Sequence, residues 1–478
     1  MGNILFVLEF MKSLEKSKML TYNVSERQWV WDTDIVPLQR ISDSVAGLLM
    51  NKLLNLDKSV LDCLIMASCF GSQINMPIME LLDGLKGVTN VRANLDIGVE
   101  EGILEKAGPL YMFSHNSLQQ TVYEITPQNS RNQLHLDIGS MLISKSACAP
   151  KEVIEELFSV ALSHINRSLP SGENGQPNEI NLSSSQRCVF AKLNLKAGQK
   201  AISNKADFSL AKFHFKAGIA FLPEQCWRDH YDLAFNVHIE YANALLVQLE
   251  YKELDTLCQV LLLKSRCVED QIKIHEILIA YLFRSGQFPE ALEHVRSVLD
   301  TLGFPLPRSI NKDTVRTVLE ALRDAASNFT PEQMRTFPLM TEDVPKQAMK
   351  IMGSVPILCT YSSPTFAAMI ASQMTQLSIQ HGLCAESAVA FGNFGFAINS
   401  ILQDFNTGYK MGNLGLTVFQ RFKSKSLIIK TYVPIFGFLK SWKVSYFAYH
   451  LLHLVSLCYM FPNPNSLVGT ITIMQRRS

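Results

Sequence analysis

His115 and His135 are the side chains in the first part of this sequence that most readily suggest chemistry, either as metal ligands or as sites of phosphotransfer. Neither has a cysteine or carboxylate at metal-ligand spacing, and neither stands in a phospho-accepting H-E-x-R box. We therefore interpret His115, beside a predicted strand at 111–113, as a hydrogen-bond donor that stabilises a join between two parts of the chain.

The usual catalytic motifs are absent from the sequence. It contains no G-x-x-x-x-G-K-[ST] loop, no G-x-S-x-G, no H-E-x-x-H and no kinase motif. Without the backbone nest and the lysine that hold nucleotide phosphates, this chain is not expected to hydrolyse ATP or to carry a cofactor. We predict a non-catalytic role.

The composition is that of a globular protein with little electrostatic preference. Of the 478 residues, 47% are hydrophobic, and 44 basic residues nearly balance 43 acidic ones. Neither nucleic acid nor an anionic membrane surface is expected as a partner on these grounds. Ten cysteines stand singly, with no C-x-x-C pair, which favours buried thiols in a reducing compartment and a cytoplasmic protein.

The segment 111–144 must position both histidines. It predicts a short strand at 111–113, a helix over 116–123, and a second helix that starts at Thr126 and Pro127. One face of that second helix carries an apolar stripe of Leu134, Ile138, Met141 and Leu142.

The stretch 113–143 resembles the F-x-H-D-R-x-Q-Q-A-A-Y-x-x-I-P-x-x-x-R-x-x-x-H-x-x-I-G-R-x-L pattern of a known family. These are the AAA-type (STAND) ATPase regions of multi-sensor hybrid histidine kinases. The residues at matching places are Phe113, His115, Gln119, Gln120, Tyr123, Ile125, Pro127, Arg131, His135, Ile138, Gly139 and Leu142. Asn116 and Ser117 replace the usual acidic-basic pair. We predict an inter-domain joint formed by Phe113, His115, Gln119, Gln120, Tyr123, Leu134, His135 and Ile138.

Residues 1–56 resemble the end of the ATPase module, as a remnant of its lid. An amphipathic helix is predicted over 2–20. Trp29-Val30-Trp31-Asp32 resembles a W-x-W-D of the family, and the period-two spacing of the tryptophans predicts that both pack from one face of a short strand.

Residues 57–125 are predicted to form a winged-helix domain, with helices near 57–71, 77–84 and 91–101 and a hairpin over 102–113. DNA binding is the obvious function of such a domain. However, the third helix sets Arg92 against Asp96, Glu100 and Glu101, and would repel phosphates. Packing against a nucleotide-binding core, as the resemblance implies, is favoured instead.

Residues 126–443 are predicted to be TPR-like helical repeats, with a mobile loop at 168–186. Polar-aromatic turns recur at 206–208, 249–251, 286–288 and 403–405. Their aromatic residues are separated by 43, 37 and 117 positions, the last being three times 39. Further stretches resemble the family, including His164-Ile165-Asn166-Arg167 for H-x-N-R.

The resemblance ends near Lys443. Residues 444–461 contain no Asp, Glu, Lys or Arg, which raises a membrane-spanning hypothesis, but two histidines and several hydroxyl side chains argue against it. We interpret 444–478 as an apolar tail unrelated to the family.

The fold class expected is therefore mainly α, with a small winged-helix domain followed by a TPR-like α-solenoid. The favoured function is a regulatory or sensor scaffold of a STAND ATPase and histidine-kinase-type signalling protein. A free-standing adaptor that binds a protein partner is the alternative. The resemblance implies ATP only for a core upstream of this chain, and a protein or that upstream domain as the partner.

Overall fold

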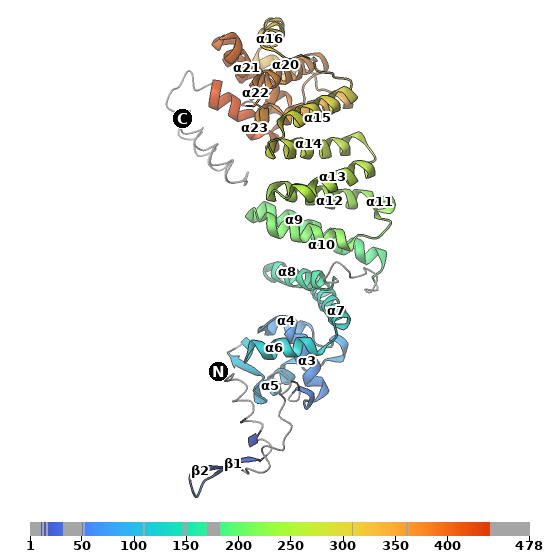
Figure 1. Ribbon diagram of the computed structural model, residues 1–478, viewed down its shortest axis with the longest axis vertical. Coiled ribbons are helices and arrows are strands. Elements are labelled where there is room, and N and C mark those ends of the chain that lie inside the picture. The colour runs from blue at the N-terminus through green and yellow to red at the C-terminus, as the bar shows by residue number, and fades with distance from the viewer. Residues whose placement is uncertain are drawn as a thin grey trace. The chain divides into compact units, whose positions relative to one another are not determined.

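The structure, a computed structural model, describes residues 11, 14–15, 18–31, 50, 53–108, 110–146, 151–169, 182–307, 309–359 and 362–439. By its contacts the chain divides into two compact units, Met1–Leu193 and Asn194–Ser478. Both are mainly helical in their described parts (Figure 1). The expectation of a mainly α-helical chain is therefore confirmed.

The first unit begins with a two-stranded ribbon, β1 (Leu20–Asn23) and β2 (Gln28–Trp31), and continues into a mixed helical and stranded part. That part contains α3 (Lys58–Ser68), β3 (Gln73–Asn75), α4 (Met76–Leu81), α5 (Val91–Glu100), β4 (Leu104–Ala107), β5 (Leu110–Phe113) and α6 (Asn116–Ile125). Two longer helices follow, α7 (Gln128–Ser146) and α8 (Lys151–Arg167). The boundary between the units falls within the next helix, α9 (Ser184–Lys205).

The sheet of the first unit has the order β3-β5-β4, with both pairs antiparallel. The hairpin of β4 and β5 was predicted, and the structure confirms it. The third strand, β3, was not predicted, because three residues are too short to show an alternating pattern. One apolar core runs through this unit and includes Leu64 of α3, Tyr111 of β5 and Ile138 of α7.

Helices α7 and α8 approach each other closely at Gly139. A Cβ atom there would lie 2.6 Å from Cγ1 of Ile165 and 2.7 Å from the carbonyl oxygen of Ala161. No side chain fits at this distance, so the two helices touch backbone to backbone. Gly139, which matches the glycine of the family pattern, is therefore needed for packing.

The second unit contains a succession of helices that pack against their neighbours in sequence (Figure 1). The first are α10 (Phe208–Phe221), α11 (Cys226–Asp229), α12 (Tyr231–Gln248), α13 (Tyr251–Lys264), α14 (Val268–Arg284) and α15 (Phe288–Thr301). They are followed by α16 (Lys312–Ser327), α17 (Pro331–Thr336), α18 (Asp343–Ser354), α19 (Pro356–Cys359) and α20 (Pro364–His381). The last are α21 (Ser387–Ala397), α22 (Phe405–Phe422), α23 (Ile428–Tyr432) and the π-helical segments Ile398–Leu402 and Val433–Leu439.

All four predicted polar-aromatic turns connect two helices, and all share one backbone geometry. Each begins with a left-handed residue: Ala206 (φ 50°), Leu249 (φ 62°), Gly286 (φ 78°) and Gln403 (φ 59°). The next residue is the N-cap, and the aromatic residue is the first residue of the new helix. The sequence pattern therefore marks a real structural repeat, in which the left-handed residue ends one helix.

The long interval between Phe288 and Phe405 does not contain further copies of this turn. Apart from Gln403, which belongs to the turn at Phe405, the described residues with positive φ in that interval are Gly303 and Gly382, and neither is followed by such a turn. The helices α16 to α20 instead share one large core with α14, α15, α21 and α22. The predicted small face of α22 is confirmed, since a Cβ atom at Gly408 would lie 2.8 Å from the carbonyl oxygen of Gly395 on α21.

The β1–β2 ribbon places both tryptophans on one face, as predicted. Register pairs Tyr22 with Trp29 and Leu20 with Trp31, and the rings of Tyr22 and Trp29 meet edge to face. However, Trp29 and Trp31 are 46% and 56% exposed. The predicted packing is therefore found for Trp29 on Tyr22, but both indole rings stay about half exposed, because a ribbon of two short strands has no sheet face large enough to cover them.

Several predictions lie outside the described residues. They concern most of the helix at 2–20, the stretch 32–49, the centre of the loop at 168–186 and the tail at 444–478. The proposed divisions after 56, 125 and 443 stay predictions. By contacts, α7 and α8 belong to the first unit.

Candidate functional site

The eight predicted joint residues all lie in the first unit, on β5, α6 and α7 or in the turn between β5 and α6. Phe113, Leu134 and Ile138 are buried in the core that also holds α3 and α5. These three residues therefore attach α7 to the body of the first unit by apolar contact.

His115 caps a helix. Its side-chain Nδ1 accepts the backbone N–H of Ser117 at 3.1 Å, at the start of α6. The prediction that His115 donates a hydrogen bond to the joint is thus wrong for this nitrogen. A helix start leaves N–H groups without partners, so an acceptor is needed there.

The C-terminal end of α3 is held from two sides. Gln119 of α6 donates from Nε2 to the carbonyl oxygen of Ser68 at 2.8 Å. Arg167, at the end of α8, donates from Nη1 to the carbonyl oxygen of Cys69 at 3.1 Å. The last carbonyls of a helix have no partner within the helix, so both side chains supply what α3 lacks. In contrast, Gln120 is exposed and bonds only to Glu124 of its own helix.

A buried hydrogen-bond chain links α6, α7 and α8. The hydroxyl of Tyr123 lies 3.0 Å from Nε2 of His135, and Nδ1 of His135 lies 2.8 Å from Nδ1 of His164. A neutral imidazole has one N–H and one bare nitrogen, so the chain is satisfied when both rings are neutral. The ring of Phe70 packs against His164, with centroids 4.5 Å apart.

The surroundings favour the neutral rings. Burial, with Arg167 and Arg131 adding to it, lowers the pKa of His135 to about 4. Burial, His135 and Arg167 lower the pKa of His164 to about 3. Protonation of both rings would set two N–H groups against each other in a buried place next to two guanidinium groups. The pair is therefore a neutral structural contact near pH 7.

Arg131 completes the network. Its guanidinium lies over the ring of Tyr123, 4.8 Å from the centroid, and Nη2 donates to Oε1 of Gln128 at 2.7 Å. Its Nε is buried and has no hydrogen-bond partner. Most of the polar residues that match the family pattern thus lie near the C-terminal end of α3.

His164 and Arg167 were not predicted as joint residues. The signal was present, because both belong to the stretch at 164–167 that matches H-x-N-R. Only the packing of α8 on α7 brings them to His135 and Cys69.

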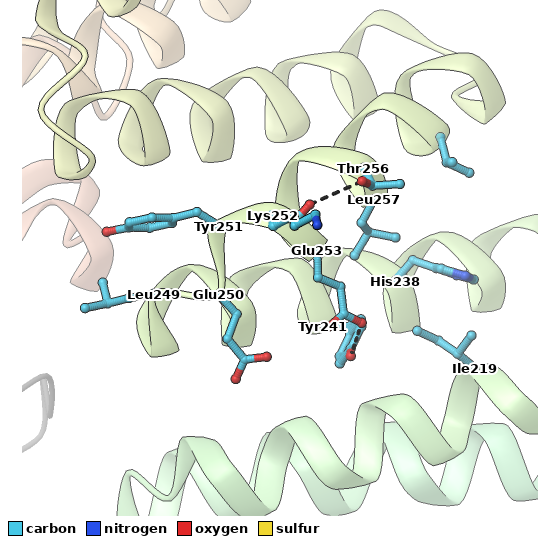
Figure 2. Close-up of a pocket in the computed structure, with 11 residues that line it drawn as sticks. Ile219, His238, Tyr241, Leu249, Glu250, Tyr251, Lys252, Glu253, Thr256 and Leu257 are labelled. Carbon is cyan, nitrogen blue, oxygen red and sulfur yellow. Dashed lines mark hydrogen bonds between the residues drawn. The ribbon is translucent and has the colours of Figure 1, made fainter. Parts of the chain in front are cut away.

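The second candidate site is a hollow of about 950 Å³ in the second unit, between α10, α12 and α13 (Figure 2). Ile219 of α10 and His238 and Tyr241 of α12 line it. The remaining lining residues come from the turn and helix that follow: Leu249, Glu250, Tyr251, Lys252, Glu253, Thr256, Leu257 and Val260. Figure 2 shows Glu250 and Tyr241 pointing toward the helix that carries Ile219. The hollow lies at one of the predicted turns.

Two further findings limit the chemistry of the described residues. No group of three or more His, Cys, Asp or Glu side chains in that part of the chain is arranged to hold a metal ion. Within the same residues, no helix is both long enough and apolar enough to cross a bilayer. The eight cysteines described are free thiols, and six of them are buried, as predicted, whereas Cys267 is exposed.

Comparison with known proteins gives a weak match to a signalling protein. No protein-family profile matches the chain. The chain has weak homology to Hybrid signal transduction histidine kinase G of Dictyostelium discoideum, with 20% identity over 500 aligned positions. The alignment covers 89% of this chain but 14% of that protein.

Among solved structures, the chain aligns with a Signal Transduction ATPase with Numerous Domains (STAND) protein with a tetratricopeptide repeat sensor from Pyrococcus horikoshii. The identity is 12% and the TM-score 0.30, over 94% of this chain and 65% of that one. A score this low carries no conclusion about the fold.

We predict that Gln119→Leu destabilises the first unit and that the neighbouring Gln120→Leu does not. Loss of the Gln119 amide leaves the Ser68 carbonyl oxygen with only the 3.2 Å bond from the Gly71 N–H. The expected loss in free energy of unfolding is about 1 kcal/mol, against less than about 0.5 kcal/mol for Gln120→Leu. Urea denaturation, together with hydrogen exchange in α3, measures the change in free energy of unfolding for each variant. Equal effects of the two substitutions would contradict the role of Gln119.

The lowered pKa values predict that the first unit loses stability in acid. The unfolded histidines take up protons near pH 6.5, whereas the folded ones do so only near pH 4 and 3. Stability therefore falls as pH decreases from 6.5 toward 4, by up to about 1.4 kcal/mol per pH unit for each histidine. Hydrogen exchange of α7 and α8, corrected for the intrinsic rate, follows this loss.

A double variant, His135→Phe with His164→Phe, should flatten that pH dependence. Tyr123→Phe is the matched control, because it removes the hydroxyl from the chain and leaves both titrating rings. If the double variant and the parent lose stability equally between pH 6.5 and 4, the histidine pair is not the cause.

Proposed function

We propose that this chain is the non-catalytic regulatory or sensor scaffold segment of a STAND ATPase and histidine-kinase-type signalling protein. The weak homology to a hybrid histidine kinase, which extends over 89% of the chain, supports a place in signal transduction. The observation that carries the proposal is the meeting of Gln119, Tyr123, His135 and Arg167 around the end of α3. Gln119, Tyr123 and His135 were predicted from the family pattern, and Arg167 belongs to the stretch that matches H-x-N-R. Gln119 and Arg167 bond to Ser68 and Cys69, and the hydrogen-bond chain of Tyr123 and His135 ends at His164, which packs on Phe70.

We further propose that residues 57–125 form a winged-helix domain. The order of α3, β3, α4, α5, β4 and β5, with β5 in the middle of the sheet, is the order of such domains and supports this proposal. A DNA-binding role has little support. Arg92 of α5 is paired with Glu80 at 2.5 Å, and Asp96 accepts from Lys106 and from the hydroxyl of Tyr111. The domain is proposed to serve protein contact instead.

The remaining parts of the proposal follow the same resemblance. Residues 1–56 would be the remnant of an ATPase lid, 126–443 TPR-like repeats and 444–478 an unrelated tail, in a cytoplasmic protein. The repeated turn geometry supports the repeats. The sequence of this chain has no phosphate-binding loop. ATP would therefore be bound by a core that is not part of this chain.

A free-standing adaptor is the second candidate. The hollow between α10, α12 and α13 favours the adaptor, because an adaptor acts by binding a ligand and needs no ATPase core upstream. Both candidates share a protein partner, and they differ in whether a catalytic core is encoded in the same reading frame.

Sequencing the transcript on the 5′ side of the codon for Met1 distinguishes the two. A continuous frame that encodes a phosphate-binding loop supports the signalling protein. An in-frame stop codon shortly upstream, with translation starting at Met1, would refute it and leave the adaptor.

The purified chain should show no saturable ATP binding in calorimetry at about millimolar nucleotide, because no backbone nest and lysine are present to hold the phosphates. A matched titration with ADP and magnesium serves as the control for weak ion binding. A dissociation constant in the micromolar range would overturn the non-catalytic assignment.

A further inference from the structure

The hollow in the second unit is held open by fixed contacts at one end. Lys212 of α10 forms an ion pair with Glu250, the N-cap residue of α13. Close to it, Nε2 of Gln248 donates to the hydroxyl of Ser209 on α10 at 2.9 Å. Since α10 and α13 are tied together there, the space between them exists before any ligand arrives.

Three of the hydroxyl and ring N–H groups that line the hollow, those of Tyr241, Thr256 and His238, are already used within the protein. The hydroxyl of Tyr241 donates to Oε1 of Glu253 at 2.7 Å, and that of Thr256 donates to the carbonyl oxygen of Lys252 at 3.2 Å. Nδ1 of His238 lies 2.7 Å from the carbonyl oxygen of Ala234, which can only accept, so this nitrogen carries the proton.

Beside the Tyr251 hydroxyl and the Lys252 ammonium, the lining offers a ligand two hydrogen-bond acceptors. Burial lowers the pKa of His238, so the ring is neutral near pH 7 and its Nε2 is a bare acceptor. Glu253 forms no ion pair with any residue that the structure describes, and its second carboxylate oxygen is available. Burial, with the bond to Glu253, raises the pKa of Tyr241, so the phenol stays a donor and holds the carboxylate in position.

Apolar side chains share the lining with these acceptors. Leu249 and Val260 are 59% and 42% exposed, and Leu257 and Ile219 are half-buried. Large apolar side chains exposed together beside a fixed carboxylate suit a ligand that is apolar with one positive group.

We propose that this hollow binds a segment of a protein partner that carries one Lys or Arg between aliphatic residues, with the cation on Glu253. This proposal rests on the proposed function, since it names the kind of partner that the scaffold binds. Lys252 also lines the hollow, but its ammonium is exposed on a flexible stem and can remain in water. The carboxylate of Glu253 is fixed by Tyr241, so a cation meets a preorganised group and an anion does not.

The test uses the full chain and three capped, fluorescent peptides of the form Gly-Leu-Leu-X-Leu-Leu-Gly, in which X is Arg, Gln or Glu. The Arg peptide should bind with a dissociation constant on the order of 0.1–1 mM, and tighter than the Gln and Glu peptides. Its affinity should fall between about 0.05 M and 0.3 M salt. Fluorescence anisotropy measures each constant.

Two variants with matched controls locate the binding. Glu253→Gln keeps an acceptor for the Tyr241 hydroxyl but removes the charge, and should weaken the Arg peptide about three- to fivefold. Its control, Glu293→Gln, changes an exposed glutamate of α15. Val260→Ala should weaken all three peptides, whereas Leu263→Ala, on the same helix but outside the hollow, should not.

Three results would overturn the proposal: no binding of the Arg peptide, equal or tighter binding of the Glu peptide, or equal affinities in Glu253→Gln and Glu293→Gln. If all three peptides bind equally and Val260→Ala abolishes that binding, the hollow binds a purely apolar ligand. That result would also reject the proposed contact between a cation and Glu253. These results are independent of the transcript. If the peptides fail to bind but the transcript encodes an upstream phosphate-binding loop, the proposed ligand is rejected and the proposed function stands. If the Arg peptide binds as expected but no such loop is encoded upstream, the signalling function is rejected and the peptide site stands.

Discussion

The last carbonyl groups of α3, which have no partner within the helix, are the constraint on which the first unit depends. A helix cannot satisfy its own last carbonyls, and the end of α3 is buried, so water does not replace the missing donors. Gln119 and Arg167 supply them from α6 and α8, which are distant in sequence. Because the donors come from two different helices, the end of α3 fixes where both must lie. The neutral pair of His135 and His164 then joins α7 to α8 at the same place.

The second unit depends on a different local rule. Four of its described helix connections turn through one left-handed residue, one N-cap and one aromatic residue, and three of the four left-handed residues are not glycine. A side chain in this conformation is disfavoured, so the turn is maintained by the packing of the two helices that it joins. The hollow lies beside one of these turns, and Leu249 and Glu250 of that turn form part of its lining.

Much of the fold could be predicted from the sequence where the signal is local. The hairpin at 104–113, the helices on either side of Pro127 and the four turns depend on short patterns of apolar, proline and aromatic residues. The features that could not be predicted depend on contacts between distant segments. The strand β3 exists because β5 is beside it, and Arg167 becomes a joint residue because α8 folds onto α7. The direction of the His115 hydrogen bond and the exposure of Trp31 depend on neighbours that a pattern of residue types does not specify.

Gly139 gives α7 and α8 a mechanical property. Where two helices meet through long side chains, rotamer changes let one slide over the other at little energetic expense. Where they meet backbone to backbone, as at Gly139 and again between Gly395 and Gly408, no deformable layer separates them. We therefore expect each such pair to move as one rigid body, so that a displacement of one helix is passed on to the other.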